Sequence, residues 1–375
     1  MTVYLYEYEA IELFKRYKIP IEKTCLAKNY EGLKKCLYEI PPPNVLKAQV
    51  LSGKRGKSGG ILFPNTKGEY LEYGKKLLGK DIAGMKVGSI LVSERIDIKK
   101  EMYIAITIDK SKKKYVVIIA AVGGMDIEEI AMHSPHMIEK IIIDPLLGYS
   151  EYVIRRIAKK LMLPVNEVKK IFIPMYRLFI ENKCLLVEIN PLVLTTDGRL
   201  LAIDRKIIFD DSFIRLDKGL KKYIDLRMCK MSESEKIAYK HGFSYVKLNG
   251  NIAIIGNGAG LTMATMDLIS LHGGKPGVFL DLGGGASSER VRNALLIVLH
   301  DKDIDKVFVN ILGGITRCDE VAEGIVRAME ETKTDKKLFV RLVGNNEEVG
   351  RKILFDKGIY AFVDLEEAVK EVVMS

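Results

Sequence analysis

The sequence predicts an α/β protein with two domains, 1–245 and 246–375, and three observations support this fold class. The chain has 375 residues, which is more than one ordinary hydrophobic core accommodates. Its residues are 48% hydrophobic and 29% charged, a balance typical of soluble globular proteins. Beyond residue 245, short apolar runs alternate with helical stretches, and this alternation predicts a doubly wound parallel sheet.

The second domain is expected to contain short buried strands, namely Ile252–Gly256, Gly277–Leu282, Lys306–Leu312, Leu338–Leu342 and Gly358–Val363. Between the second and third strands, apolar residues at i, i+3, i+4 and i+7 mark the buried face of a helix, made of Val291, Ala294, Leu295 and Val298. Ser287 or Ser288 can cap this helix. The helix after Gly260 is expected to end at His272-Gly273, because glycine permits a left-handed turn.

Glycine-containing segments follow four of these strands, namely G-N-G-A-G (256–260), G-G-G-A (283–286), G-G-I-T-R (313–317) and G-N-N (344–346). In open parallel sheets, ligands bind beyond the carboxyl ends of the strands, so we expect a binding site at this edge. NAD is not the expected ligand. In the first segment, Leu261 stands where the third glycine of a dinucleotide fingerprint falls.

The first domain has a less regular order of strand-like runs, namely Val45–Leu51, Ile90–Val92, Tyr103–Ile108, Tyr115–Ala120 and Leu185–Ile189. The charged segment 212–245 is interpreted as a connector between the two halves. Within it, Ser232 and Glu235 have the spacing of a capping box, and Gly242 can end the helix that they begin.

The segment 185–204 predicts a hairpin that carries a metal site. If T-D-G (196–198) forms a three-residue loop with glycine at its left-handed position, Asn190 lies directly opposite Asp204. Because side chains alternate between faces, Glu188 joins Asn190 on the same face. Three oxygen donors on one face suit Mg²⁺. The polar outer face of a hairpin explains this pattern equally well.

The segment K-A-Q-V-L-S-G-K-R-G-K-S-G-G-I-L-F (47–63) places cations and glycines between strand-like residues. We expect Lys47 within the strand, and Arg55 and Lys57 in a loop that closes over phosphates. Mg²⁺ shares phosphate oxygens with its nucleotide, so the loop and the metal platform together favour a nucleoside triphosphate. The segment contains no Walker A motif, and a solvated basic hairpin is the alternative interpretation.

In seven segments the chain resembles the β subunit of succinate–CoA ligase, also called succinyl-CoA synthetase, of the ATP-grasp class. In the family's order these are E-Y-E-A-I-E-L-F-K-R-Y-K-I-P (7–20), the run from Lys47, V-E-I-N-P-L-V-L-T, N-G-A-G-L-T-M-A-T-M-D, F-L-D-L-G-G-G-A, V-N-I-L-G-G-I-T-R-C-D and R-L-V-G-N-N-E-E-V-G. The resemblance covers nearly the whole chain. It implies an N-terminal ATP-grasp domain of two α+β subdomains, followed by a flavodoxin-like CoA-ligase domain.

The resemblance also implies an activity and a partner. The family interconverts succinate, CoA and ATP or GTP with succinyl-CoA, ADP or GDP and phosphate, through a phosphohistidine on an α subunit that carries most of the CoA site. The chain is therefore expected to be the nucleotide-binding half of an acid–CoA ligase. Relatives that share these motifs act on malate or citrate, which are the alternative acids.

Individual site residues follow from the same resemblance. It assigns to the nucleotide the phosphate-binding residues Lys47, Lys54, Arg55 and Gly56, the base-binding residues Glu94 and Asp97, and Glu101 near the ribose. It assigns Mg²⁺ to Asn190 and Asp204, in agreement with the hairpin register. It implies that Glu188 orients the travelling histidine, and that the phosphohistidine site shared with the α subunit includes Asn257, Gly314, Ile315 and Thr316.

Three departures from the family pattern stand out. Lys54 replaces the usual glycine, which bears on nucleotide affinity. Arg205 follows the metal-binding aspartate where a small residue is common, and whether it faces the opposite side is open. Thr316 stands where relatives often have valine. None of these departures removes a metal or phosphate ligand.

The composition of the chain favours a protein of the cytoplasm. The five cysteines form no C-x-x-C, which argues against a disulfide framework or a zinc site and fits a reducing cytoplasm. No apolar run is long enough to span a bilayer. The first residues carry Glu7 and Glu9 without a basic region, so no secretory signal is expected.

The net charge of +10 raises the alternative of a nucleic-acid-binding protein. The cations are scattered along the chain, and no known nucleic-acid motif occurs, so we expect no nucleic-acid partner. A third possibility is an ATP-grasp ligase of another type that acts alone, such as a carboxylase. The glycine segments of the second domain argue against it.

Overall fold

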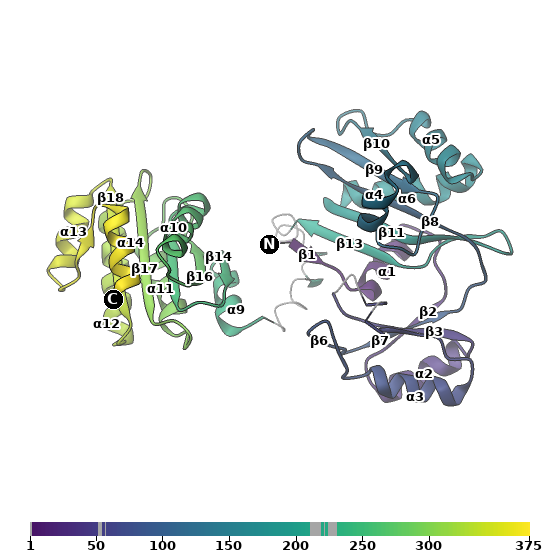
Figure 1. Cartoon of the computed structure of the whole chain (residues 1–375), viewed down its shortest axis with the longest axis horizontal. Coiled ribbons are helices and arrows are strands. Elements are labelled where there is room, and N and C mark those ends of the chain that lie inside the picture. Colours follow the sequence, from purple (N-terminus) through teal and green to yellow (C-terminus); the bar gives the residue numbers. More distant parts are fainter. Residues whose placement is uncertain (1, 52–54, 57, 211–218, 221, 224–230) are drawn as a thin grey trace. The chain divides into compact units, whose positions relative to one another are not determined.

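The computed structural model describes the chain apart from residues 1, 52–54, 57, 211–218, 221 and 224–230. Contacts divide it into two compact units, Met1–Ile224 and Asp225–Ser375 (Figure 1). This division lies earlier than the predicted boundary at residue 245. The helix α9 (Glu233–Lys240) precedes β14 (Ser244–Lys247), and β14 pairs with a strand of the second unit. Part of the predicted connector is therefore a component of that unit.

The first unit contains a large antiparallel sheet in the order β1-β13-β11-β8-β9-β10, with β12 paired to β11. Its strands are β1 (Thr2–Tyr4), β8 (Ile98–Asp109), β9 (Lys114–Ala120), β10 (Ile138–Ile143), β11 (Cys184–Thr195), β12 (Leu200–Ala202) and β13 (Arg205–Asp210). Two helices, α5 (Glu151–Leu161) and α6 (Val165–Glu181), pack against it through apolar residues at helical spacing. The short helices α4 (Ile127–His133) and η1 (Pro135–Met137) precede β10.

The smaller lobe of the first unit is an antiparallel sheet in the order β2-β7-β3-β4. The elements of this lobe are β2 (Thr24–Ala27), α2 (Tyr30–Glu39), β3 (Asn44–Ala48), β4 (Ile61–Leu62), α3 (Lys67–Leu77), β5 (Asp81–Ile82), β6 (Met85–Lys86) and β7 (Ile90–Glu94). Figure 1 shows α2 and α3 on the side of this sheet that faces away from the large sheet. The helix α1 (Glu7–Arg16) precedes the lobe and contacts β13 and α6.

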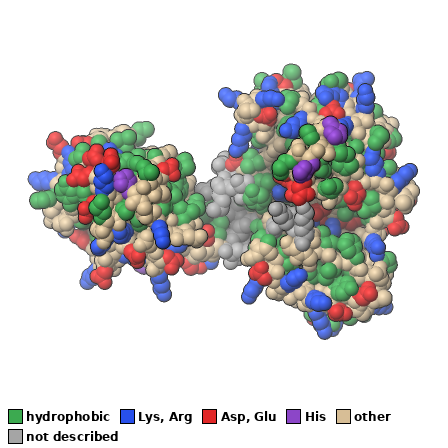
Figure 2. All heavy atoms as spheres, in the orientation of Figure 1, with side chains coloured by type: hydrophobic (Ala, Val, Ile, Leu, Met, Phe, Trp, Pro, Cys, Tyr) green, Lys and Arg blue, Asp and Glu red, His purple; other side chains and the backbone are tan. Residues whose placement is uncertain are grey.

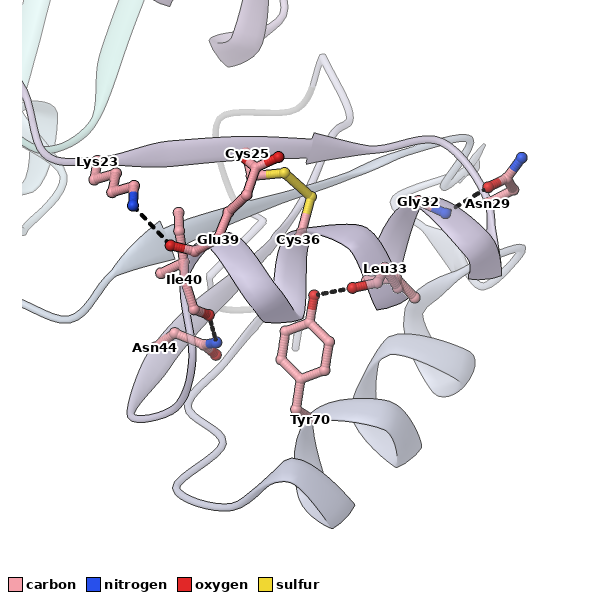
Figure 3. Close-up of a disulfide and its surroundings, with 10 residues drawn as sticks. All are labelled: Lys23, Cys25, Asn29, Gly32, Leu33, Cys36, Glu39, Ile40, Asn44 and Tyr70. Atoms are coloured by element: carbon pink, nitrogen blue, oxygen red, sulfur yellow. Dashed lines mark hydrogen bonds between the residues drawn. A yellow bond between two sulfur atoms is a disulfide. The ribbon is translucent and has the colours of Figure 1, made fainter.

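A disulfide joins Cys25 of β2 to Cys36 of α2 (Figure 3). The prediction from cysteine spacing was therefore wrong for this pair. The pairing depends on tertiary structure, because α2 folds back across β2 and brings the Cα atoms of the two cysteines to within 5.6 Å. The same close-up shows Tyr70 of α3 donating a 2.9 Å hydrogen bond to the carbonyl oxygen of Leu33, which ties α3 to α2. Cys184 and Cys318 are free and buried.

The second unit is the predicted doubly wound sheet, in the order β14-β16-β15-β17-β18-β19. All its pairings are parallel except that of β14 at one edge. If the five parallel strands β15 to β19 are numbered 1 to 5 along the chain, their order in the sheet is 2-1-3-4-5, which is the flavodoxin-like order. The strands are β15 (Ile252–Gly256), β16 (Pro276–Asp281), β17 (Lys306–Gly313), β18 (Lys337–Gly344) and β19 (Ala361–Phe362).

Helices cover both faces of this sheet. One apolar cluster includes residues of α11 (Ser288–Leu299), α12 (Cys318–Thr332) and α13 (Glu347–Phe355), and the other includes residues of α10 (Ala259–Leu271) and α14 (Leu365–Met374). The predicted helix signals are confirmed. The Ser287 side chain caps α11, Ser232 and Glu235 form the capping box of α9, and Gly273 follows α10 with a φ of +87°. None of the described helices has the length and apolar character needed to cross a membrane.

Candidate active site

The predicted hairpin is confirmed in its register. Leu194 pairs with Leu200, the Asn190 N–H donates to the Asp204 carbonyl oxygen at 2.9 Å, and the same register continues along β11 and β13. Gly198 has a φ of +86°, the left-handed conformation that a three-residue loop requires. The backbone therefore places Asn190 and Asp204 side by side.

A cavity of about 730 Å³ lies where this hairpin meets the smaller lobe. Five residues assigned from the sequence line it, namely Arg55, Gly56, Glu188, Asn190 and Asp204. Further lining residues include Glu7, Arg205, Lys206 and the segment 124–128. Figure 2 shows acidic side chains gathered at the hollow between the two lobes of this unit. The cavity is therefore walled by both carboxylates and cations.

The Asn190 side chain is held by the segment that follows β9. The Gly124 N–H donates to Asn190 Oδ1 at 2.8 Å, and Asn190 Nδ2 donates to the Met125 carbonyl oxygen at 2.9 Å. Gly124 has a φ of +72°, and a Cβ added to it would stand 2.4 Å from Glu101 Oε2. A side chain at this position would be strained by the positive φ and would displace the carboxylate of Glu101. Glu101 thus lies beneath this segment and does not line the cavity.

Glu188 is a carboxyl group in a largely dry position. Burial raises its pKa, and Lys206, its cross-strand partner, partly offsets that effect. The Tyr103 hydroxyl donates to Glu188 Oε2 at 3.1 Å and fixes the orientation of the carboxyl group. Glu188 therefore presents to the cavity an oriented carboxyl group with a raised pKa.

Behind the cavity lies a buried group of charges. Lys47 Nζ is 2.9 Å from Glu7 Oε1, 3.4 Å from Glu22 Oε1, and donates to the Ile203 carbonyl oxygen at 2.7 Å. Lys47 is only 4% exposed and does not line the cavity. Its assigned contact with nucleotide phosphates stays a prediction, because in this structure its charge is directed to carboxylates.

Arg205 belongs to the same buried group. Its guanidinium donates to Glu22 Oε1 at 2.6 Å and lies 3.7 Å from Glu7 Oε1, and its side chain is fully buried. The open question from the sequence is thereby answered, since Arg205 points toward α1 and the segment before β2. We did not single out Glu7 or Glu22 as site residues. The one signal was Arg205 itself, because a cation within an apolar strand requires a buried counter-charge.

Arg55 connects this group to the cavity. Its Nη2 lies 2.6 Å from Glu7 Oε2 and 2.8 Å from Asp204 Oδ1. Burial alone would raise the pKa of Glu7, but Arg55, Lys47 and Arg205 outweigh it and lower that pKa to about 2. Burial disfavours the charged form of Arg55, yet Asp204 and Glu7 raise its pKa above the ordinary value. Glu7 and Arg55 are therefore both charged near neutral pH.

The remaining assigned residues of the first unit lie elsewhere. Glu94 ends β7, where its Oε2 accepts from the Lys23 N–H at 3.4 Å, and the Asp97 carbonyl oxygen accepts from the Thr196 N–H at 3.0 Å. Neither lines the cavity. Lys54 and Lys57 fall outside the described residues. Their roles, like those of Glu94 and Asp97, stay predictions.

The glycine segments of the second unit lie together at the carboxyl ends of its parallel strands. Asn257 Nδ2 donates to the Leu312 carbonyl oxygen at 2.9 Å and to Thr316 Oγ1 at 3.3 Å. The Gly285 N–H also donates to Thr316 Oγ1, at 3.0 Å. Thr316 is buried, whereas Ile315 beside it is 86% exposed. The structure thus brings Asn257 and 314–316 into one hydrogen-bonded corner.

The cavity of the first unit offers Mg²⁺ few protein ligands. Among the described residues, no group of three or more His, Cys, Asp or Glu side chains is arranged to hold a metal. Asn190 and Asp204 supply one amide oxygen and one carboxylate at the cavity, and the Asp204 side chain is 35% exposed. Few protein oxygens are typical of Mg²⁺ sites that share phosphate oxygens and water. The donor set therefore fits a magnesium–nucleotide complex better than a metal held by protein alone.

Comparison with known proteins supports both units. A family model described as an ATP-grasp domain matches residues 4–194, and one described as CoA-ligase matches residues 255–373. The chain is 44% identical to the succinate–CoA ligase (ADP-forming) subunit beta of Staphylothermus marinus, covering 98% of this chain and 97% of that protein. It is 42% identical to the GDP-forming subunit beta of Thermus thermophilus, covering 98% of each.

A solved structure shows that the whole fold is shared more widely. The chain superposes on ATP citrate lyase from Methanothrix soehngenii, in complex with citrate and coenzyme A, with a TM-score of 0.76 and coverage of 100% of both chains. At 19% identity, this likeness shows the fold alone.

Proposed function

Because the chain belongs to the succinate–CoA ligase β-subunit family, we propose that it is the nucleotide-binding subunit of an enzyme that interconverts succinate, CoA and ATP or GTP with succinyl-CoA, ADP or GDP and phosphate. One observation carries the proposal: relatives with this name are 41–44% identical over nearly the whole chain. The cavity chemistry agrees, since it combines a cation with paired oxygen donors. These relatives favour succinate over malate or citrate.

The first unit is proposed to bind the nucleotide. Arg55 and Gly56 would contact its phosphates, and Asn190 and Asp204 would hold Mg²⁺. When bound, this ion would neutralise part of the phosphate charge during transfer. The carboxylates of the cavity wall repel phosphate oxygens, so the cations beside them are needed to keep the local charge balanced.

The proposed α partner is supported by the relatives, which are named as β subunits. None of the residues that line it in the described part of the chain is a histidine. A phosphohistidine would therefore come from the partner subunit, and Glu188 would orient it through the carboxyl group that Tyr103 holds. We propose that Asn257 and 314–316 receive the same histidine at the other site, where backbone N–H groups near a helix start favour phosphate.

The preferred nucleotide is not fixed by the relatives. ADP-forming and GDP-forming subunits match the chain almost equally well, at 44% and 42% identity. We therefore propose ATP or GTP as the substrate class, with both nucleotides to be compared. A cytoplasmic location likewise stays a prediction.

The test is to combine the chain with its α subunit and measure CoA-dependent release of ADP and GDP. Release with succinate, and none from either subunit alone, is the expected result. Malate and citrate serve as comparison acids. If no dicarboxylate supports release with either nucleotide, the proposal is rejected.

A further inference from the structure

The proposed metal ligand Asp204 already has a cation beside it. Arg55 Nη2 lies 2.8 Å from Asp204 Oδ1 and 2.6 Å from Glu7 Oε2, so one guanidinium bridges two carboxylates. The Arg55 side chain is 9% exposed and that of Glu7 2%, whereas Asp204 is 35% exposed, so the Glu7 end of the bridge is shielded from water and the Asp204 end opens to the cavity. A planar, permanently charged guanidinium suits such a bridge better than an ammonium group does.

This arrangement affects any divalent cation that approaches Asp204. Two like charges a few ångströms apart repel each other, and the repulsion is stronger where water is partly excluded. The carboxylate that would attract Mg²⁺ is neutralised by Arg55. A free metal ion is therefore disfavoured at Asp204 as long as the guanidinium stays there.

A nucleoside triphosphate changes this balance, because its phosphates bring enough negative charge for both cations. The second partner of Arg55 gives it a fixed anchor, since Glu7 is itself held by Lys47 at 2.9 Å. The guanidinium can thus leave Asp204 without losing Glu7. A phosphate oxygen would then replace the carboxylate as its second acceptor.

We propose that Arg55 is an exchange residue: without nucleotide it neutralises Asp204 and excludes free divalent cations, and with nucleotide it turns to a phosphate and releases Asp204 to the metal. This inference rests on the proposed nucleotide site. It adds that metal and nucleotide bind together, with little binding of the metal alone. Arg55 acts on the metal through Asp204 and is in that respect a positioning residue.

The test measures Mn²⁺ binding to the complex of the chain with its α subunit, by electron paramagnetic resonance and without nucleotide. Arg55→Gln removes the competing charge, so the affinity for free Mn²⁺ should rise about tenfold or more. Arg55→Lys keeps the charge and should bind Mn²⁺ as weakly as the wild type. Arg199→Gln is the matched control, because Arg199 pairs with Asp197 at the hairpin loop and is half-exposed.

The affinity of Arg55→Gln for nucleotide should change in the opposite direction to its affinity for Mn²⁺. Arg55→Gln should weaken ATP binding in calorimetry while it strengthens Mn²⁺ binding, a reversal that simple loss of structure does not produce. Unchanged affinity for free Mn²⁺ in Arg55→Gln would overturn the inference.

If Arg55→Gln does not fold, Mn²⁺ binding to the wild type and to Asp204→Asn still tests the proposal. Tight Mn²⁺ binding to the wild type without nucleotide, lost in Asp204→Asn, would show that Arg55 does not exclude the metal and would overturn the proposal. Neither readout depends on turnover, so failure here leaves the proposed ligase activity standing. Failure of CoA-dependent release with the expected metal behaviour would reject only the ligase activity.

Discussion

The two units build their polar sites in different ways. In the first unit, Arg55 lies far along the chain from the hairpin of Asn190 and Asp204. An ion pair joins Arg55 to Asp204, and the segment after β9 holds Asn190. In the second unit, Asn257 and Thr316 sit on loops after parallel strands and are joined by uncharged hydrogen bonds. A parallel sheet positions its loops through topology alone, whereas the first site depends on which charges meet. Each prediction below tests or sharpens this difference.

The largest effect is expected from breaking the buried ion pair of Arg205 with Glu22. Within the described part of the chain, Arg205→Ala leaves the buried Glu22 with only the 3.4 Å contact to Lys47 and should destabilise the first unit by about 3–5 kcal/mol. The double variant Glu22→Leu/Arg205→Met should recover most of that loss, because an apolar pair of similar volume removes the uncompensated charge. Hydrogen exchange followed by mass spectrometry, resolved to peptides of α1 and β13, measures both.

The matched control lies in the second unit. Arg292 pairs with Glu331 at 2.5 Å, but both side chains are substantially exposed. Arg292→Ala should change stability by less than about 1 kcal/mol. Equal effects of Arg205→Ala and Arg292→Ala would contradict the distinction between the two units.

Acid should affect the first unit through Glu7. Its pKa is lowered from 4.5 to about 2, so the folded state holds the charged form more strongly than the unfolded chain does. The resulting stability, about 3 kcal/mol, is fully present above pH 4.5 and is lost as the pH falls toward 2. Denaturant unfolding between pH 7 and pH 2 checks this. Glu7→Gln should be less stable at pH 7 and respond less to acid; an unchanged slope would refute the assignment.

Removal of Asp204 should act on binding more than on folding. Asp204→Ala deletes the carboxylate of the proposed metal site and should weaken magnesium–ATP binding by at least about 100-fold. Calorimetry on the complex with the α subunit measures the affinity. The control is Asp197→Ala, which alters the same hairpin at its exposed loop. Unchanged nucleotide affinity in Asp204→Ala would remove the metal role.

The smallest effect is expected in the second unit. Thr316→Val removes the oxygen that accepts from the Gly285 N–H and Asn257 Nδ2, and should cost about 1 kcal/mol in the stability of that unit. Turnover should persist, since the family resemblance implies that valine is compatible with function at this position. Thermal unfolding and the CoA-dependent assay measure the two quantities. Loss of turnover would show that the hydroxyl does more than join two loops.

The sequence predicted the second unit well for a physical reason. Each strand was a short apolar run, and the carboxyl ends of parallel strands must meet at one edge. The neighbourhood of Asn257 and 314–316 therefore followed from local patterns. The hairpin of Asn190 and Asp204 was predictable for a similar reason, because the loop length fixed its register.

The charges behind the first site were not predictable in this way. Glu7, Glu22 and Lys47 are far from Arg205 in the chain, and no spacing rule links an ion pair between α1, β3 and β13. The resemblance assigns Lys47 to nucleotide phosphates, which stays a prediction, and the contacts of Lys47 with Glu7 and Glu22 had no signal in the sequence. The pairing of Cys25 with Cys36 escaped prediction for the same reason, because it depends on how α2 folds over β2.

The Cys25–Cys36 bond makes one lobe of this protein sensitive to thiol reagents. Its two cysteines are 11 residues apart, and opening a loop of this size should cost about 2–3 kcal/mol. The free cysteines Cys184 and Cys318 are buried thiols outside that lobe, so a reductant has no bond to break there. Samples prepared with and without dithiothreitol therefore differ in the lobe beside the cavity, and nucleotide affinities should be compared only between samples of the same redox history.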